Sequence, residues 1–146
     1  MIAAKCLYRS NDLLGESPLW INEENSIYWV DIERCLINKF DVKILSKKTW
    51  KFKEQIGSIA EYKKDKFIAA SENGFNFIDL KKNITIPITN PEKNLVNNRF
   101  NDGQCDNKGR FYSGSMNKIG VDSTGSFYIL YNNLTSKKID ENYITT

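Results

Sequence analysis

Three residues in the stretch NNRFNDGQCDNKGRFYSGSM, at positions 97–116, have side chains suited to binding chemistry. Arg99 carries a planar fork of donors that fits a carboxylate or several hydroxyl or carbonyl oxygens. Asn101 supplies both a donor and an acceptor. The pair predicts contacts to a polyhydroxylated or carbonyl-bearing small molecule; the alternative is a surface ion pair of Arg99 and a turn capped by Asn101. Asp102 and Gly103 are typical of a turn, in which Asp bonds to nearby backbone.

Glu16, in the segment GESPLW, is the candidate metal ligand. It comes directly before the segment SPLW, as Gly57-Ser58 comes before IAEY and Asn101-Asp102 before GQCD. If these three segments are the innermost strands of neighbouring blades around one channel, the Glu16 carboxylate and the Asn101 carboxamide face the same space and can bind a hard cation, with water completing its ligands. The alternative is a solvated loop carboxylate.

The rarer side chains exclude other chemistries. The chain of 146 residues has no His, which excludes Ser-His-Asp and Cys-His triads and His-ligated zinc. Cys6, Cys35 and Cys105 are dispersed and form no CxxC pair, which is typical of free thiols in a reducing cytoplasm. A metal would be held mainly by oxygen ligands, which favours calcium, magnesium or manganese.

The elements that must position these residues are short strands. Runs rich in aromatic and β-branched residues recur along the chain, among them SIYWVDI, KFIAAS, FNFIDL and SFYILY. Polar turn signals such as NEEN, KKDK and STG separate them. Alternation of this kind, with even spacing, predicts an all-β chain.

The strands recur as a repeat. Ile27, Phe67 and Phe111 occupy matching places, so the offsets are 40 residues (67 − 27) and 44 residues (111 − 67). Four strands per unit at this period favour a β-propeller over a sandwich of meandering strands. The blades are expected at about 16–53, 56–89 and 99–140 within one partial propeller of residues 1–146. Trp20, Trp29 and Trp50 are expected to pack between blades.

Three blades leave the ring incomplete, because closed propellers usually have about four to eight blades. The chain is then expected to be part of a longer protein, to associate with another copy, or to stand as an open fan.

Charge and hydropathy exclude two further classes of partner. The formal net charge is +3 and the lysines are scattered, so nucleic acid is not an expected partner. No apolar run reaches the roughly 18 residues of a membrane helix. The first fifteen residues lack a basic segment followed by a sustained apolar core, so no signal peptide is expected and a cytoplasmic location is predicted.

Three segments together resemble the senescence-marker protein (regucalcin)/gluconolactonase family: LLGESPLW, SIYWVDIERCLINKFD and NNRFNDGQCDNKGRFYSGSM. The resemblance runs along essentially the whole chain and implies a six-bladed β-propeller, many members of which hydrolyse sugar lactones with a divalent metal. It implies that Glu16 is a metal ligand, and that Arg99 and Asn101 contact substrate. The metal implied is calcium, zinc, magnesium or manganese. In the loop where the family often places an acidic substrate contact, Asp122 is the only carboxylate, and it is not a secure equivalent.

The resemblance also implies that the chain is the N-terminal half of such a protein. The family's remaining metal ligands, an Asn and an Asp, and its general base lie in later blades, so no catalytic residue is expected within these 146 residues. A polypeptide carrying the C-terminal half is a candidate partner. The leading hypothesis is a sugar-lactone hydrolase, truncated or split and inactive alone. The alternatives are a non-catalytic calcium-binding or regulatory propeller and a non-functional gene fragment.

Overall fold

The computed structural model describes residues 3–146 and contains three four-stranded antiparallel sheets. The first comprises β1 (Gly15–Ile21), β2 (Ser26–Asp31), β3 (Leu36–Asp41) and β4 (Ser46–Lys51). The second comprises β5 (Ile56–Lys63), β6 (Lys66–Ser71), β7 (Gly74–Asp79) and β8 (Ile84–Thr89). The third comprises β9 (Asn98–Cys105), β10 (Phe111–Asn117), β11 (Gly125–Leu130) and β12 (Ser136–Tyr143). A short 3-10 helix, η1 (Asn22–Glu24), joins β1 to β2.

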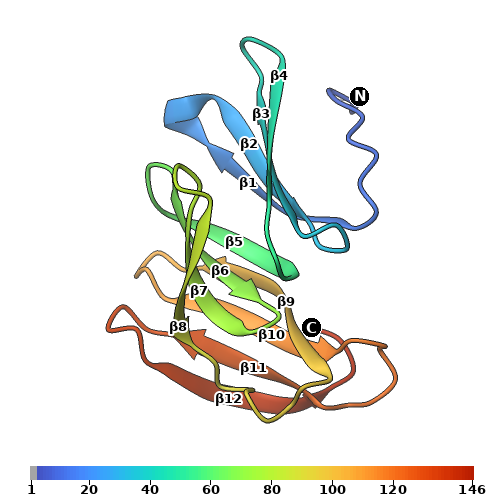
Figure 1. Ribbon diagram of the computed structural model, residues 1–146, viewed down its shortest axis with the longest axis vertical. Helices are drawn as coiled ribbons and strands as arrows, with labels where there is room; N and C mark the ends of the chain where they lie inside the picture. The colour runs from blue at the N-terminus through green and yellow to red at the C-terminus, as the bar shows by residue number, and fades with distance from the viewer. Residues whose placement is uncertain (1–2) are drawn as a thin grey trace.

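Within each sheet the strands pair in chain order, and the three sheets follow one another in a stack (Figure 1). Several tight turns contain residues that tolerate a left-handed backbone, such as Asn25 (φ 47°), Asp65 (φ 58°) and Asn83 (φ 54°). We refer to the sheets as blades 1, 2 and 3. The prediction of an all-β, propeller-type chain with three four-stranded blades is confirmed. None of the helical residues in the described range forms a segment long and apolar enough to cross a membrane.

Blade 2 lies between the other two blades, and each of its faces contributes to an apolar cluster. On one face Phe67 packs on Tyr28 of blade 1, with ring centroids 5.0 Å apart. On the other face Phe75 packs on Phe100 of blade 3, with centroids 4.8 Å apart. Burial of each such side chain contributes about 1.5–3 kcal/mol, so these clusters hold the stack together.

The repeat inferred from the sequence corresponds to equivalent positions in the blades. Phe67 faces the preceding blade 1, and Phe111 faces the preceding blade 2, where its ring lies 6.0 Å from that of Phe75. Ile27 is at the same register and faces away from blade 2, and it lines an open groove with Trp29 and Phe40. The periodic signal is therefore a blade-to-blade packing position.

Only Trp50 of the three tryptophans packs between two blades. It is 9% exposed and belongs to the cluster between blades 1 and 2. Trp20 is 49% exposed, and Trp29 lies on the outer face of blade 1, where its Nε1 donates to Asp12 (2.7 Å). Within residues 3–146 the prediction of inter-blade packing therefore holds for Trp50 alone, because strand register places Trp20 and Trp29 on the face of blade 1 that points away from blade 2.

The innermost strands β1, β5 and β9 each contain a bulge at the same level of the blade. Ser17 and Pro18 oppose one residue of β2, Gly57 is the extra residue of β5, and Asn101 and Asp102 oppose one residue of β10. Bulges bend a strand and re-aim its side chains, and they recur beside binding sites. The prediction that Asp102 and Gly103 form a turn is wrong, since both lie within β9. The turn comes later, at 106–110, where Asp106 accepts from backbone N–H groups.

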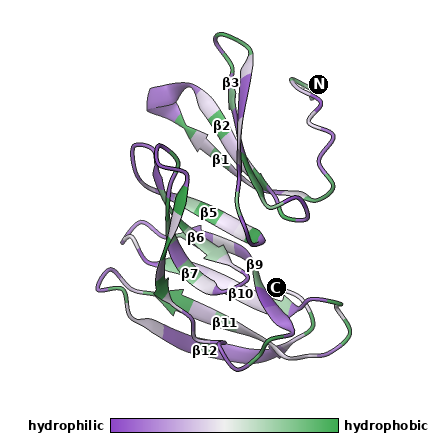
Figure 2. Ribbon diagram, in the orientation of Figure 1, coloured by the Kyte–Doolittle hydropathy of each residue, from purple (hydrophilic) through white to green (hydrophobic). Residues whose placement is uncertain are grey.

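The outer strand of blade 3, β12, is polar and exposed. β12 is largely hydrophilic (Figure 2), and six of its eight residues are exposed. Blade 3 therefore ends in a polar, solvent-facing strand.

Candidate functional site

The three inner strands lie side by side, with β5 against both β1 and β9. Together they line a cavity of about 470 Å³. Its walls are Ser17, Pro18, Leu19, Ile59, Ala60, Glu61, Asp102, Gly103, Gln104 and Cys105. We call this space the channel. The sequence-predicted residues Glu16, Arg99 and Asn101 do not line this cavity. Glu16 and Asn101 directly precede the lining residues Ser17 and Asp102 in the chain, at the end where the inner strands begin, which we call the channel mouth.

Arg99 is a buried cation at this end of the channel. Its side chain is 7% exposed. Its Nη1 donates to the carbonyl oxygen of Phe100 (3.1 Å) and to Asn101 Oδ1 (2.7 Å). Burial lowers the pKa of Arg99, while the negative charges of Glu33, Glu16 and Glu72 oppose that shift. The negative charges of these three carboxylates, from blades 1 and 2, thus favour the charged form of the guanidinium. None of the three forms an ion pair with Arg99 within residues 3–146.

The guanidinium also has donors to spare. Within the described residues no hydrogen bond involves Nε or Nη2 of Arg99. In the same part of the chain, Ser58 Oγ is the only fully buried side-chain nitrogen or oxygen without a partner. The free nitrogens of Arg99 are therefore accessible from the surface and can donate to a ligand.

Asn101 sits in the β9 bulge and lies directly against Arg99. Its Oδ1 accepts from the guanidinium, and its Nδ2 donates to the carbonyl oxygen of Thr146 (2.5 Å). The contact with Arg99 fixes the orientation of the Asn101 amide, with Oδ1 toward the guanidinium. Nδ2 faces away from it and keeps a second N–H besides the one that bonds to Thr146. The structure thus brings Arg99 and Asn101 together as one polar unit.

Gly57 allows β5 to approach this unit. A Cβ on Gly57 would lie 2.3 Å from the Asn101 carbonyl oxygen and 2.6 Å from that of Phe100. These are backbone atoms and cannot rotate away. The absence of a side chain at position 57 is therefore a condition for the position of Asn101.

We expect Gly57→Ala to displace β9 and to lower the free energy of unfolding by about 1–3 kcal/mol, the usual range for overpacking. The matched control is Gly15→Ala, whose new Cβ would meet only the side chain of Asp12, at 3.1–3.6 Å. Chemical denaturation measures the stability, and the amide chemical shifts of Phe100 and Asn101 report the displacement. Equal effects of the two variants would contradict this account of Gly57.

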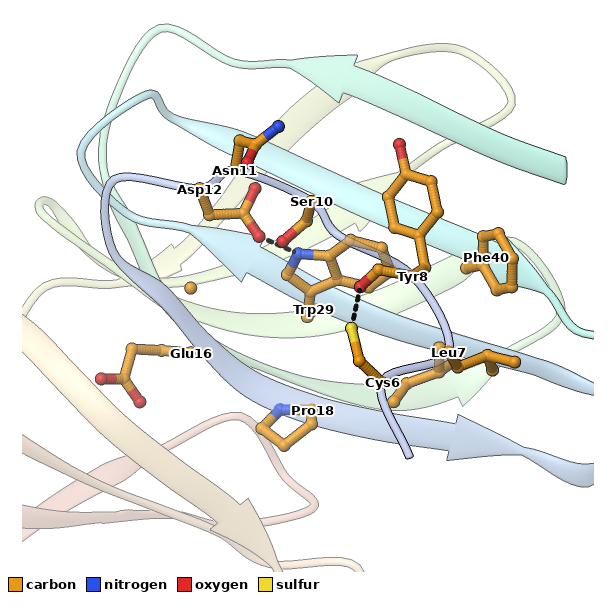
Figure 3. A pocket seen from close by; sticks show the side chains of 12 residues that line it. Cys6, Leu7, Tyr8, Ser10, Asn11, Asp12, Glu16, Pro18, Trp29 and Phe40 are labelled. Carbon is orange, nitrogen blue, oxygen red and sulfur yellow. Dashed lines mark hydrogen bonds between the residues drawn. The ribbon is translucent and has the colours of Figure 1, made fainter. Parts of the chain in front are cut away.

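Glu16 is exposed at the start of β1 and makes no hydrogen bond or ion pair within residues 3–146. It lines a groove of about 860 Å³ on the outer face of blade 1. In Figure 3 its carboxylate points away from Trp29 and Tyr8, which line that groove. Of the three candidate residues Glu16 alone lines this groove, whereas Arg99 and Asn101 lie on β9, outside it.

Glu16 is the candidate oxygen ligand for a divalent metal. Residues 3–146 contain no group of three or more Cys, Asp or Glu side chains arranged to hold a metal ion. Glu16 can supply one oxygen ligand, whereas hard cations take about six to eight oxygens and their affinity depends on the number of carboxylates.

Several polar residues near the channel mouth were not singled out from the sequence. Lys118, in the β10–β11 loop, forms an ion pair with Glu72 of blade 2 (2.5 Å) and donates to the Val96 carbonyl oxygen (3.0 Å). Asp122 accepts from Asn117 Nδ2 (3.3 Å) and therefore secures its own loop. Glu92 is buried beneath the start of β9. Their positions depend on contacts between blades and loops, and no local motif marks them.

Stacked four-stranded sheets with bulged inner strands around a polar channel mouth define a β-propeller-type protein. Residues 14–146 match the SMP-30/Gluconolactonase/LRE-like region, and the chain therefore belongs to this family. The resemblance inferred from the motifs is confirmed.

Individual relatives support the same assignment. The chain is 30% identical over 112 residues to the 6-deoxy-6-sulfogluconolactonase of Pseudomonas putida, covering 77% of this chain and 38% of the relative. It is 27% identical over 135 residues to regucalcin of Xenopus laevis, covering 89% and 45%. The crystal structure of a calcium-binding protein, regucalcin, from Agrobacterium tumefaciens superposes with a TM-score of 0.91 at 21% identity, covering 97% of this chain and 48% of that one. The chain thus spans less than half the length of these relatives.

Proposed function

We propose that this chain forms the substrate-orienting half of a sugar-lactone hydrolase channel. The observation that carries the proposal is the buried Arg99 guanidinium, which is joined to Asn101 and has nitrogens left free to donate. The lactonase relative makes a sugar lactone the substrate class to consider first. In this role Arg99 and Asn101 donate to the hydroxyl and ring oxygens of the sugar and hold its orientation.

Glu16 is proposed as one ligand of a divalent metal whose other ligands lie outside these residues. When bound, such a metal polarises the lactone carbonyl. Calcium, zinc, magnesium and manganese are the candidates, and the Agrobacterium relative is described as calcium-binding. Because one exposed carboxylate binds such ions weakly, we propose that the 146-residue chain alone does not hydrolyse lactones. A non-catalytic calcium-binding role and a non-functional fragment remain the competing proposals.

The roles of Arg99 and Asn101 can be tested by NMR titration of the chain with D-glucono-1,5-lactone. We expect the lactone to shift the Arg99 Nε–H and Asn101 Nδ2 signals with weak affinity, and Arg99→Met to weaken binding at least about tenfold, since it removes charge-assisted hydrogen bonds. Arg34→Met is the control, because Arg34 is a partly exposed arginine that bonds only to the N-terminal segment and Asp31.

Two results would contradict the proposal. One is lactone binding that Arg99→Met leaves unchanged. The other is metal-dependent lactone hydrolysis by the 146-residue chain itself, measured through the acid that the reaction releases. Such hydrolysis would show that this chain suffices for catalysis. Calcium binding at micromolar concentrations, with no lactone binding, would favour the calcium-binding alternative.

A further inference from the structure

Glu92 is a buried carboxylate that the proposed function does not use. It lies in the connection between β8 and β9 and is 7% exposed. No Lys or Arg within residues 3–146 forms an ion pair with it. A buried charge without a counter-ion is costly unless several hydrogen bonds satisfy it.

Donors from three strands of blade 3 converge on Glu92. Its Oε1 accepts from Ser115 Oγ of β10 (2.6 Å) and from the Tyr128 hydroxyl of β11 (3.1 Å). Its Oε2 accepts from Asn98 Nδ2 at the start of β9 (3.1 Å). Burial and the negative charge of Glu92 raise the pKa of Tyr128 to about 12, so its phenol stays protonated and remains a donor. One carboxylate therefore joins β9, β10 and β11 at their channel-mouth end.

Asn98 transmits this arrangement to the neighbouring loop. Its Nδ2 also donates to the Thr124 carbonyl oxygen (3.0 Å), and its Oδ1 accepts from Thr124 Oγ1 (2.7 Å). Thr124 closes the loop between β10 and β11, and Arg99 is the next residue after Asn98. The orientation of the Asn98 amide thus sets both the loop and the backbone from which the Arg99 side chain leaves β9.

We propose that Glu92 is a positioning residue that holds Arg99 and the loop at 118–124 at the channel mouth. This inference rests on the proposed function of Arg99. The ionised carboxylate accepts from all three partners at once. A glutamine at position 92 either faces Asn98 with its N–H₂ group, which sets two donors against each other, or faces Ser115 and Tyr128 with it, so that their hydroxyls must stop donating and accept instead. Turning the Asn98 amide to relieve this clash breaks its two bonds to Thr124.

The test is Glu92→Gln, with hydrogen exchange as the local readout. We expect exchange to accelerate at least about tenfold in residues 97–101 and 117–126, and to stay unchanged in β2 of blade 1. The matched control is Glu54→Gln, because Glu54 precedes β5 as Glu92 precedes β9 but is only partly buried and bonds only to Asn73. Tyr128→Phe is a milder second variant that keeps the ring and removes one donor to the carboxylate. It should accelerate exchange in the same residues by a smaller factor.

Hydrogen exchange that accelerates uniformly across all blades would overturn the proposal and make Glu92 a general packing residue. Unchanged exchange in residues 97–101 would also overturn it, because Glu92 would then have no effect on β9. A second readout is the lactone-induced shift of Arg99, which Glu92→Gln should weaken although Glu92 is not placed at the lactone. If Arg99→Met has no effect on lactone binding while the local exchange response is present, the proposed function fails and the positioning of β9 by Glu92 stands.

Discussion

Phe75→Ala is expected to lower the free energy of unfolding by about 3–5 kcal/mol, the usual cost of emptying a buried aromatic site. Phe75 is completely buried in the cluster between blades 2 and 3, against the rings of Phe100 and Phe111. Phe100 lies between Arg99 and Asn101 in the chain, so the cavity forms directly behind the candidate site. The variant should therefore weaken lactone binding as well as stability.

Urea denaturation and lactone titration measure these two effects. Phe77→Ala is the control: Phe77 belongs to the same strand and contacts Tyr62 with tilted rings, 5.1 Å between centroids, but it is only partly buried. Equal losses of stability for the two variants would mean that the cluster between blades 2 and 3 contributes no more to the free energy of unfolding than the contact of Phe77 with Tyr62. Unchanged lactone binding by folded Phe75→Ala would show that β9 keeps its position without this packing.

Asp31→Asn is expected to cost about 2–4 kcal/mol at neutral pH, because several donors lose a buried charged acceptor. The Asp31 carboxylate is fully buried. It accepts from the backbone N–H of Leu13 (3.1 Å), Leu14 (3.3 Å) and Arg34 (3.3 Å), and from Arg34 Nη1 (3.2 Å). These bonds fix the segment that leads into Glu16, so the variant should also increase the mobility of the start of β1.

The effect of this variant depends on pH. Burial by itself would raise the pKa of Asp31, but the three backbone donors and the Arg34 charge outweigh it, and the pKa falls below its ordinary value of 3.8. A lowered folded-state pKa contributes stability above the unfolded-state value, and this stability is lost as the pH falls through the folded-state pKa. The stability difference between wild type and Asp31→Asn should therefore be constant above about pH 5 and shrink as the pH falls below 3.8 and through the lowered folded-state pKa.

Asp41→Asn is the control for Asp31. Asp41 likewise accepts from two backbone N–H groups, of Lys43 (2.9 Å) and Ile44 (3.1 Å), but its carboxylate lies in a partly exposed turn. It should cost about 1 kcal/mol. A stability difference for Asp31→Asn that stays constant over this pH range would refute the linkage.

Much of the fold is predictable from the sequence, because burial alternates with strand geometry. The equivalence of Ile27, Phe67 and Phe111 is visible as a repeat since each blade must present an apolar residue to its predecessor. The proximity of Arg99 and Asn101 also follows from the sequence, because residues two apart in a strand lie on the same side.

Other features depend on pairing that no local pattern encodes. Whether Asp102 belongs to a turn or to a bulge is decided by β10, which provides one residue opposite Asn101 and Asp102, while Gly103 pairs regularly with Ser113. The faces occupied by Trp20 and Trp29 are decided by the register of blade 1. Glu92 was missed because its partners Ser115 and Tyr128 are 23 and 36 residues away in the chain. A lone glutamate in a polar loop resembles any solvated glutamate until those strands are in place.

The order of the blades has a consequence for how the protein loses its structure. Within residues 3–146, blade 2 packs extensively on both neighbours, whereas the main contact between blades 1 and 3 is a small one between β1 and β9. Stability in such a stack is approximately a sum of single-unit terms and nearest-neighbour terms. Within the described residues, losing blade 2 therefore breaks two interfaces at once. The Arg99–Asn101 unit of blade 3 is tied to the rest of this stack through the packing of Phe100 on Phe75.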